Sequence, residues 1–302
     1  MFYTIQSMAD ARQSKAGWGG DGTSSRGASK RRPAGEASPV LEKSIGLLQV
    51  RYGPRVIQPA STLSHRSAPP HVSTGFVQLD ALTGCGGVPL GAITLFTGRT
   101  TSGKLTVAYK VLANAQRTSG RLAGEHRSRE APLRGVAILD LTYTANPDYL
   151  ARCGVDLEHL LFARAPAPDQ VMDVIFDLAR GGLRLLLVDG LPDLLRDVAV
   201  ARRFDAVLPE LKMMLASLPC AVLFVDEARP PWLRWLRPES GGIAHCAALQ
   251  VDLQREQWLE HGRDLIGYRA QAQVVRSRWA RGGQMVPLEI VFDDTVRARE
   301  TW

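Results

Sequence analysis

The sequence predicts an α/β protein with a mostly parallel sheet, helices on both faces and antiparallel strands at one edge. Strand-like apolar runs alternate with segments of helical spacing between residues 92 and 226. Three further strand-like runs then follow one another, at residues 248–253, 266–276 and 286–292. Alternating strands and helices form a parallel sheet that is covered on both faces, whereas consecutive strands with short connections pair antiparallel.

Each core element follows from its local pattern. Apolar, β-branched runs bounded by glycine or polar residues predict strands, and apolar residues three or four positions apart predict helices. Gly181 and Gly182 end one of these helices. In chain order we expect a strand at 92–97, a helix at 104–117, a strand at 136–141, a helix at 167–180, a strand at 183–189, a helix at 205–217 and a strand at 220–225.

The composition is that of a globular protein with one sizeable domain. The chain has 302 residues, 45% of them hydrophobic, and a net charge of +7, which suits a nucleic-acid partner. It has no apolar run of transmembrane length and no signal-peptide pattern at its start. The four cysteines are widely spaced and form no C-x-x-C pair, and the six histidines are scattered. We therefore expect neither a metal site nor disulfides. We expect a cytoplasmic protein without membrane association.

The chain divides into three segments. Residues 1–39 are rich in Gly, Ser, Ala, Arg and Lys, and predict a disordered basic tail. Residues 40–71 hold a short helical pattern (Leu41, Ile45, Leu48) and then a linker rich in Pro, Ser and His. Residues 72–302 form the core domain.

A phosphate-binding motif follows the first core strand. It reads G-x-x-x-x-G-K and then Leu, where the motif has Ser or Thr, and consists of Gly98, Arg99, Thr100, Thr101, Ser102, Gly103, Lys104 and Leu105. A strand, a Gly-rich turn and a helix direct backbone N–H groups and the helix dipole at an anion. A Gly-rich turn that binds nothing is the alternative interpretation.

The metal half of this site is incomplete in the sequence. Asp189 ends the strand 183–189, where such proteins place a carboxylate that orients Mg²⁺. Leu105 has no hydroxyl for the metal, and Thr106, the next residue, points about 100° away on a helix. We therefore expect ATP to be bound weakly or without hydrolysis, and the Mg²⁺ site is in doubt.

Several stretches together resemble the core of the bacterial RecA recombinases. They are residues 72–80, 86–91, 146–149, 153–156, 187–189, 241–242 and 251–253, besides the phosphate loop. The resemblance covers residues 41–293 and implies a RecA-like P-loop core without the RecA C-terminal domain. It implies that Tyr149 lies where RecA holds adenine, that Gly241 and Gly242 end a DNA-binding loop, and that the helix near residue 41 is of the polymerisation type.

The departures from the RecA pattern concern catalysis. Thr142 occupies the position of the catalytic glutamate, and Thr cannot act as a carboxylate base. Glu227 stands where RecA has the glutamine that senses the γ-phosphate. The resemblance therefore implies a degenerate ATPase in which no residue is assigned a catalytic role. An active ATPase would need Thr106 and a substitute carboxylate, Asp140 or Glu227.

A segment rich in tryptophan and arginine lies where the second DNA loop of RecA would be. It contains Arg229, Trp232, Arg234, Trp235 and Arg237. Aromatic rings that stack on bases contribute roughly 1–3 kcal/mol per base, and Arg pairs with phosphates. Two alternatives remain open, in which the tryptophans pack on the core or dock a protein.

Three functions follow from these observations. The first is a DNA repair or SOS accessory protein, similar to the ImuA-type proteins of translesion synthesis, that binds single-stranded DNA, a RecA-type recombinase or a translesion polymerase. The second is an active DNA-dependent ATPase that promotes recombination and strand exchange. The third is a scaffold that caps RecA filaments without binding DNA. The helix near residue 41 also suggests self-association.

Overall fold

The computed structural model describes residues 39–53, 57, 68–124, 135–165, 167–228, 241–293 and 295–299. The chain splits into two compact units, Met1–His65 and Arg66–Trp302. The first unit contains the expected helix, α1 (Pro39–Tyr52), and Gln49 near its end donates a hydrogen bond to the Ile57 carbonyl at 3.0 Å. The predicted disordered tail lies, up to residue 38, outside the described residues.

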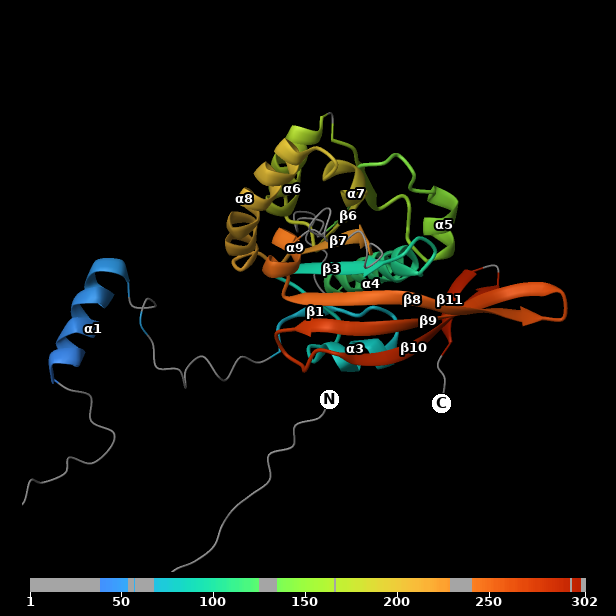
Figure 1. Cartoon of the computed structure of the whole chain (residues 1–302), viewed down its shortest axis with the longest axis horizontal. Helices are drawn as coiled ribbons and strands as arrows, with labels where there is room; N and C mark the ends of the chain where they lie inside the picture. The colour runs from blue at the N-terminus through green and yellow to red at the C-terminus, as the bar shows by residue number, and fades with distance from the viewer. Residues whose placement is uncertain are drawn as a thin grey trace, which may run out of the picture. The chain divides into compact units, whose positions relative to one another are not determined.

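The second unit is built on a nine-stranded sheet within the described part of the chain (Figure 1). Its order is β11-β10-β9-β8-β3-β7-β6-β4-β5. The strands are β3 (Ile93–Gly98), β4 (Val136–Asp140), β5 (Leu160–Ala163), β6 (Leu185–Asp189), β7 (Ala221–Glu227), β8 (Leu249–His261), β9 (Asp264–Ser277), β10 (Gln284–Asp293) and β11 (Thr295–Arg299). All pairs from β8 to β5 are parallel, and β8 to β11 pair antiparallel. The predicted fold class is confirmed.

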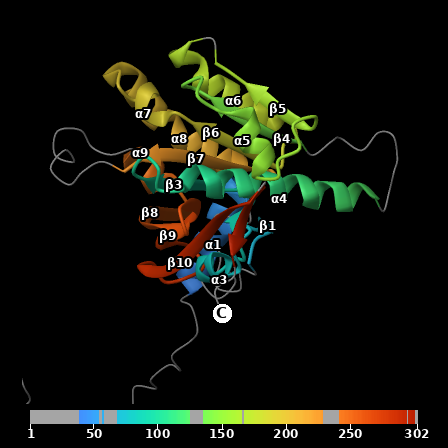
Figure 2. The same cartoon turned by 90° about the vertical axis from the view of Figure 1, so that its right-hand side faces the viewer.

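Helices cover both faces of this sheet (Figure 1, Figure 2). Alternate residues of each central strand point to opposite faces, so that Phe96 of β3 joins one core and Leu95 the other. The helices α3 (Val77–Thr83), α4 (Lys104–Gly124) and α5 (Pro147–Arg152) pack on the first core. The second core takes α6 (Val171–Arg180), α7 (Leu191–Leu194), α8 (Val198–Leu215) and α9 (Gly241–Cys246).

Short elements complete the unit. A two-stranded sheet pairs β1 (His71–Val72) with β2 (Val88–Pro89), and the 3-10 helix η1 (Pro168–Gln170) leads into α6. Among the described residues, no helix has the length and apolar character of a bilayer span. All four cysteines are buried free thiols.

Some element boundaries differ from the sequence-based expectation. The helix expected at 205–217 begins at Val198, because the Asp197 carboxylate caps it and accepts from the Ala199 amide at 2.7 Å. Strands β5 and β11 were not expected. Strand β8 was expected to end at Leu253 but runs on to His261, and with β9 it forms a hairpin that projects from the sheet (Figure 1).

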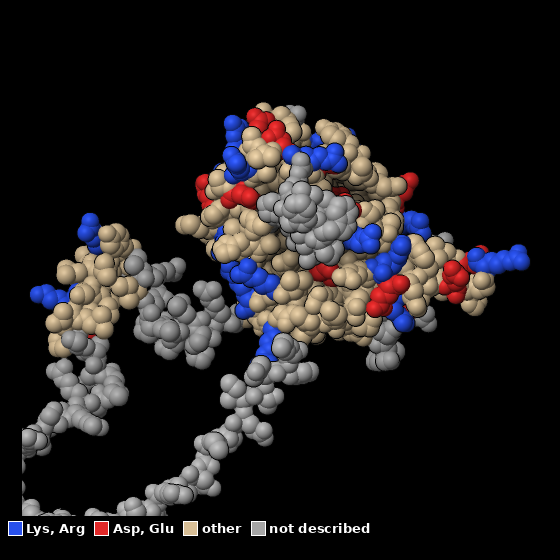
Figure 3. All heavy atoms as spheres, viewed as in Figure 1, with Lys and Arg blue, Asp and Glu red and all other residues tan. Residues whose placement is uncertain are grey.

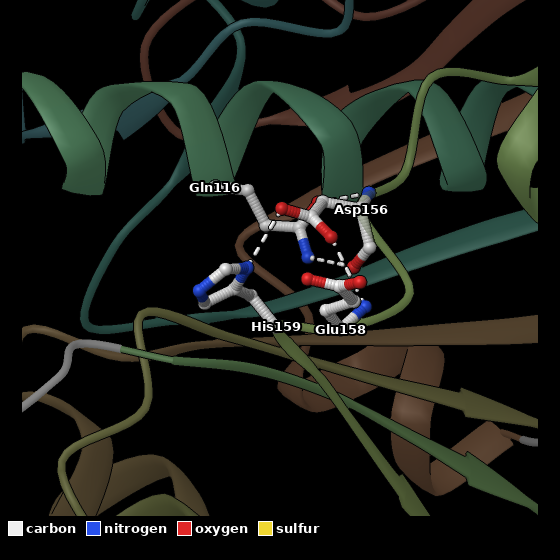
Figure 4. Close-up of polar contacts among 4 residues, drawn as sticks. All are labelled: Gln116, Asp156, Glu158 and His159. Carbon is white, nitrogen blue, oxygen red and sulfur yellow. Dashed lines mark hydrogen bonds and ion pairs between the residues drawn. The ribbon is translucent and has the colours of Figure 1, made fainter.

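Polar contacts fix the segment after α5 to helix α4 (Figure 4). The Gln116 side chain donates to the Asp156 carbonyl and accepts from the Asp156 amide, both at 2.9 Å. The Asp156 carboxylate lies 2.7 Å from His159 Nδ1, and this hydrogen bond lowers the pKa of Asp156. The helix that begins at the phosphate loop is thereby tied to the strand β5 segment.

Candidate nucleotide site

The candidate site lies where the central strands end. Because these strands are parallel, their carboxyl ends meet at one edge of the sheet, the usual ligand site in such folds. The register sets Asp140 of β4 beside Asp189 of β6, and it sets Thr97 of β3 between Asp226 of β7 and Asp252 of β8. Strand β3 then leads into the phosphate loop, residues 98–104.

Two glycines of the loop lie too close to their neighbours to carry a side chain. A Cβ on Gly98 would lie 2.5 Å from the Leu253 carbonyl oxygen. A Cβ on Gly103 would lie 2.9 Å from the Tyr268 hydroxyl, and Gly103 has a φ of +94°. The Ser102 amide donates to the Arg99 carbonyl at 3.0 Å, and α4 begins at Lys104. The loop therefore has the strand–turn–helix geometry that can receive phosphate.

Lys104 is half-buried at the end of the loop, where α4 begins. Its ammonium donates to the carbonyl oxygens of Gly98 at 2.9 Å and Arg99 at 3.3 Å. Burial lowers the pKa of Lys104, against the opposing attraction of nearby carboxylates, of which Glu227 and Asp189 are the strongest. Glu227 also accepts a hydrogen bond from the Thr100 hydroxyl. Glu227 is thereby bonded to the loop, and its correspondence to a γ-phosphate sensor stays a prediction.

Asp189 and Asp140 are buried carboxylates behind the loop. Burial raises the pKa of Asp189, against a hydrogen bond from the Gly190 amide; the neighbouring Asp140 raises it further, and Lys104 lowers it. Asp140 is fully buried and accepts from the amides of Thr142 at 3.1 Å and Ala145 at 3.2 Å. Its carboxylate therefore holds the turn that follows β4.

The hydroxyl groups of Thr106 and Thr142 are already bonded to protein groups. Thr106 is 4% exposed, and its hydroxyl lies 2.6 Å from the Tyr149 hydroxyl and accepts from the Tyr268 hydroxyl at 2.9 Å. The Thr142 hydroxyl donates to Asp140 at 3.3 Å and lies 2.7 Å from the Thr144 hydroxyl. Leu105 is partly buried against the core.

These residues fit a phosphate group but not a Mg²⁺ ion of the usual P-loop kind. Loop amides and Lys104 can hold phosphate oxygens. The metal hydroxyl is replaced by Leu105, and Thr106 is engaged by two tyrosines. No group of three or more acidic, His or Cys side chains in the described part of the chain is arranged for a metal ion.

Tyr149 reaches the site from α5. Asn146 caps this helix by accepting from the Tyr149 amide at 3.1 Å, and the Tyr149 ring meets Tyr109 edge-on at 6.0 Å. Its hydroxyl is bonded to Thr106 rather than left free. The assignment of Tyr149 to an adenine base stays a prediction.

Three residues near the loop were not found from the sequence. Arg255 of β8 donates to the Thr101 hydroxyl at 3.0 Å and lies over the Trp258 ring at 4.4 Å. Trp258 meets Tyr268 of β9 edge-on at 5.8 Å. Because β8 was expected to end at Leu253, the later residues were not placed beside the loop. Gly262, which has a φ of 66° at the turn between β8 and β9, is the sequence signal that could have indicated a hairpin here.

The predicted DNA-binding residues fall mostly outside the described residues. Arg229, Trp232, Arg234, Trp235 and Arg237 belong to this group. Gly241 and Gly242 open α9, and Gly242 packs closely against Asp205 of α8. On the face drawn in Figure 3, basic and acidic side chains of the core are interspersed.

Replacing Thr106 by Val tests the hydroxyl cluster. The change keeps the shape of the side chain but leaves the Tyr149 and Tyr268 hydroxyls without their shared partner. We expect a loss of about 1–3 kcal/mol in the free energy of unfolding, measured by urea denaturation. Thr106→Ser keeps the hydroxyl and is the control. Equal losses in the two variants would contradict a role for the hydrogen bonds.

Replacing Asp189 by Asn tests the buried carboxylate. A pKa raised above the ordinary 3.8 means that the folded state favours the protonated acid, so the ionised group destabilises the fold as pH rises. We expect Asp189→Asn to raise the Tm at pH 7, with a gain that shrinks as the pH falls towards 3.8. Asp193→Asn, in an exposed ion pair with Arg196, is the control. A gain that is independent of pH would oppose this explanation.

Comparisons with known proteins agree with this geometry. The family model of the RecA N-terminal domain matches residues 40–297. Protein RecA of Paenarthrobacter aurescens is 26% identical over 239 residues, which cover 73% of this chain and 65% of that protein. Protein RecA of Roseiflexus sp. is 25% identical over 279 residues, which cover 86% of this chain and 75% of that protein. Protein RecA of Sulfurimonas denitrificans is 25% identical over 289 residues, which cover 89% of this chain and 77% of that protein. The chain thus spans slightly less than two thirds of the first of these relatives. Because the family model matches most of the length of the chain, the chain belongs to the RecA family.

Proposed function

We propose that this protein is a RecA-like accessory protein of DNA repair. It binds single-stranded DNA, or a recombinase or translesion polymerase, and holds ATP in a degenerate site without effective turnover. The ImuA-type proteins are the subgroup that this combination resembles. Membership of the RecA family supports a role connected with DNA.

The observation that carries the proposal is the state of the hydroxyl and carboxylate groups around the phosphate loop. Leu105 has no hydroxyl, and the Thr106 hydroxyl is bonded to two tyrosines. The Thr142 hydroxyl is hydrogen-bonded to the Asp140 carboxylate and the Thr144 hydroxyl. Loss of a single catalytic group typically costs about 10²–10⁴ in rate. The loop nevertheless keeps Lys104 and its glycine geometry, which supports binding without hydrolysis.

The DNA contact is assigned to the segment between residues 229 and 240. Its alternating Arg and Trp residues suit the phosphates and bases of a single strand. The net charge of +7 favours the same partner. Helix α1 supplies apolar side chains for a second contact, either with another copy of the chain or with a recombinase.

Nucleotide titration tests the degenerate site. Binding of labelled ATP in EDTA and in Mg²⁺ should be of similar strength, without hydrolysis in the presence of single-stranded DNA. Leu105→Thr should make binding stronger in Mg²⁺ but leave hydrolysis absent, because Thr142 is still not a base. Adding Thr142→Glu should give measurable turnover, and Lys104→Ala should abolish binding. DNA-stimulated turnover by the unchanged protein would instead support the active ATPase.

Single-stranded DNA binding tests the partner assignment. We expect the triple change of Arg229, Arg234 and Arg237 to Glu to abolish the anisotropy change of a labelled oligonucleotide, because three phosphate contacts become repulsive. The control is a triple change of Arg202, Arg203 and Lys212 on α8 to Glu, which alters the net charge by the same amount at another place. If the unchanged protein binds no DNA but retains a recombinase, the filament-capping scaffold is the better description.

A further inference from the structure

Arg255 lies beside the phosphate loop because of the register between β3 and β8. The two strands are parallel and paired as far as Gly98 and Leu253. Strand β8 continues past this pair, so that Arg255, two residues further, runs alongside the loop. Its guanidinium donates to the Thr101 hydroxyl at 3.0 Å. Thr101 belongs to the middle of the loop and has a φ of 65°, which is uncommon for a β-branched residue.

The guanidinium is held in place by packing. It lies over the Trp258 ring at 4.4 Å, within the range of a cation–π contact. Trp258 packs edge-on against Tyr268, and the Tyr268 hydroxyl donates to Thr106 on the first turn of α4. The position of Arg255 is therefore coupled to the helix that carries the loop. Such an arrangement loses less side-chain freedom on binding a ligand than an unsupported arginine would.

The charges around the loop call for a second cation. The carboxylates of Glu227, Asp189, Asp226 and Asp252 lie near enough to Lys104 to raise its pKa against the effect of burial. A polyphosphate that entered without a divalent metal would add further negative charge to this group. The residues around Leu105 and Thr106 do not fit the usual metal, so the compensating charge has to come from side chains.

The loop also contains an unsatisfied hydroxyl. Ser102 is 2% exposed, and its Oγ has no hydrogen-bond partner among the described residues. A buried hydroxyl without a partner costs free energy, and an oxygen of a bound anion would offer it an acceptor. This observation is independent of Arg255 and points to a ligand in the same loop.

We propose that Arg255 is a second phosphate-binding cation of this site, which takes a nucleoside triphosphate without a divalent metal. A guanidinium has five N–H donors in a planar fork, so it can bond phosphate oxygens while it keeps the Thr101 contact. The inference deepens the proposed function and rests on its nucleotide-binding part. Arginine suits this role better than lysine because of its bidentate geometry.

The test is a titration of the full chain with ATP, ADP and AMP in EDTA, on the unchanged protein and on Arg255→Ala, Arg255→Lys and Arg263→Ala. The control Arg263→Ala removes the same charge at the far end of the hairpin. Arg263 is ten residues beyond Leu253, which corresponds to roughly 30 Å along an extended strand. Thermal unfolding without nucleotide shows that each variant is folded.

We expect Arg255→Ala to weaken ATP binding about tenfold or more, and AMP binding little, because the lost contact is with the outer phosphates. Arg255→Lys should recover part of the affinity, and Arg263→Ala should stay within about twofold of the unchanged protein. Unchanged ATP binding in Arg255→Ala, or equal weakening of ATP, ADP and AMP, would overturn the phosphate contact while leaving the proposed function intact. If the unchanged protein binds no nucleotide, the nucleotide part of the proposed function fails together with this inference.

Discussion

The balance of charge around Lys104 is the constraint on which the site depends. Parallel strands necessarily end at one edge of the sheet, and here several end in or beside carboxylates, among them Asp140, Asp189 and Asp226. Burial raises the pKa of Asp189 and lowers that of Lys104, and the attraction between the ammonium and the carboxylates opposes both shifts. Any ligand that enters this group has to be judged by the charge that it adds or removes.

Thr106, the residue after Leu105, has a structural role in the first turn of α4. Thr106 sits about 100° round the helix from position 105. Its hydroxyl joins α4 to Tyr149 of α5 and Tyr268 of β9, three elements that are distant in the sequence. The polar group of the first helical turn therefore stabilises the fold. A hydroxyl that is held in this way by two tyrosines is oriented by the fold and not towards the phosphate loop's ligand.

The sequence predicted the layers of the fold well, because the strands 93–98, 136–140, 185–189 and 221–227 are buried on both faces and read as apolar runs. It predicted the projecting hairpin poorly. Beyond Leu253 the side chains of β8 are mostly polar and mostly exposed, so no burial pattern marks the strand. Arg255 was missed for that reason, since its role depends on strand register, which only the pairing of β3 with β8 defines.

The same packing changes what the phosphate motif can be taken to mean. Gly98 and Gly103 are required by the close approach of Leu253 and Tyr268, whether or not a nucleotide ever enters. The glycines alone therefore cannot distinguish a working loop from a structural turn. Lys104 is stronger evidence, because burying an ammonium costs free energy that a purely structural turn would not require. The functional signal of this loop thus lies in its cation, and Arg255, packed on Trp258 beside it, extends that signal to a second strand.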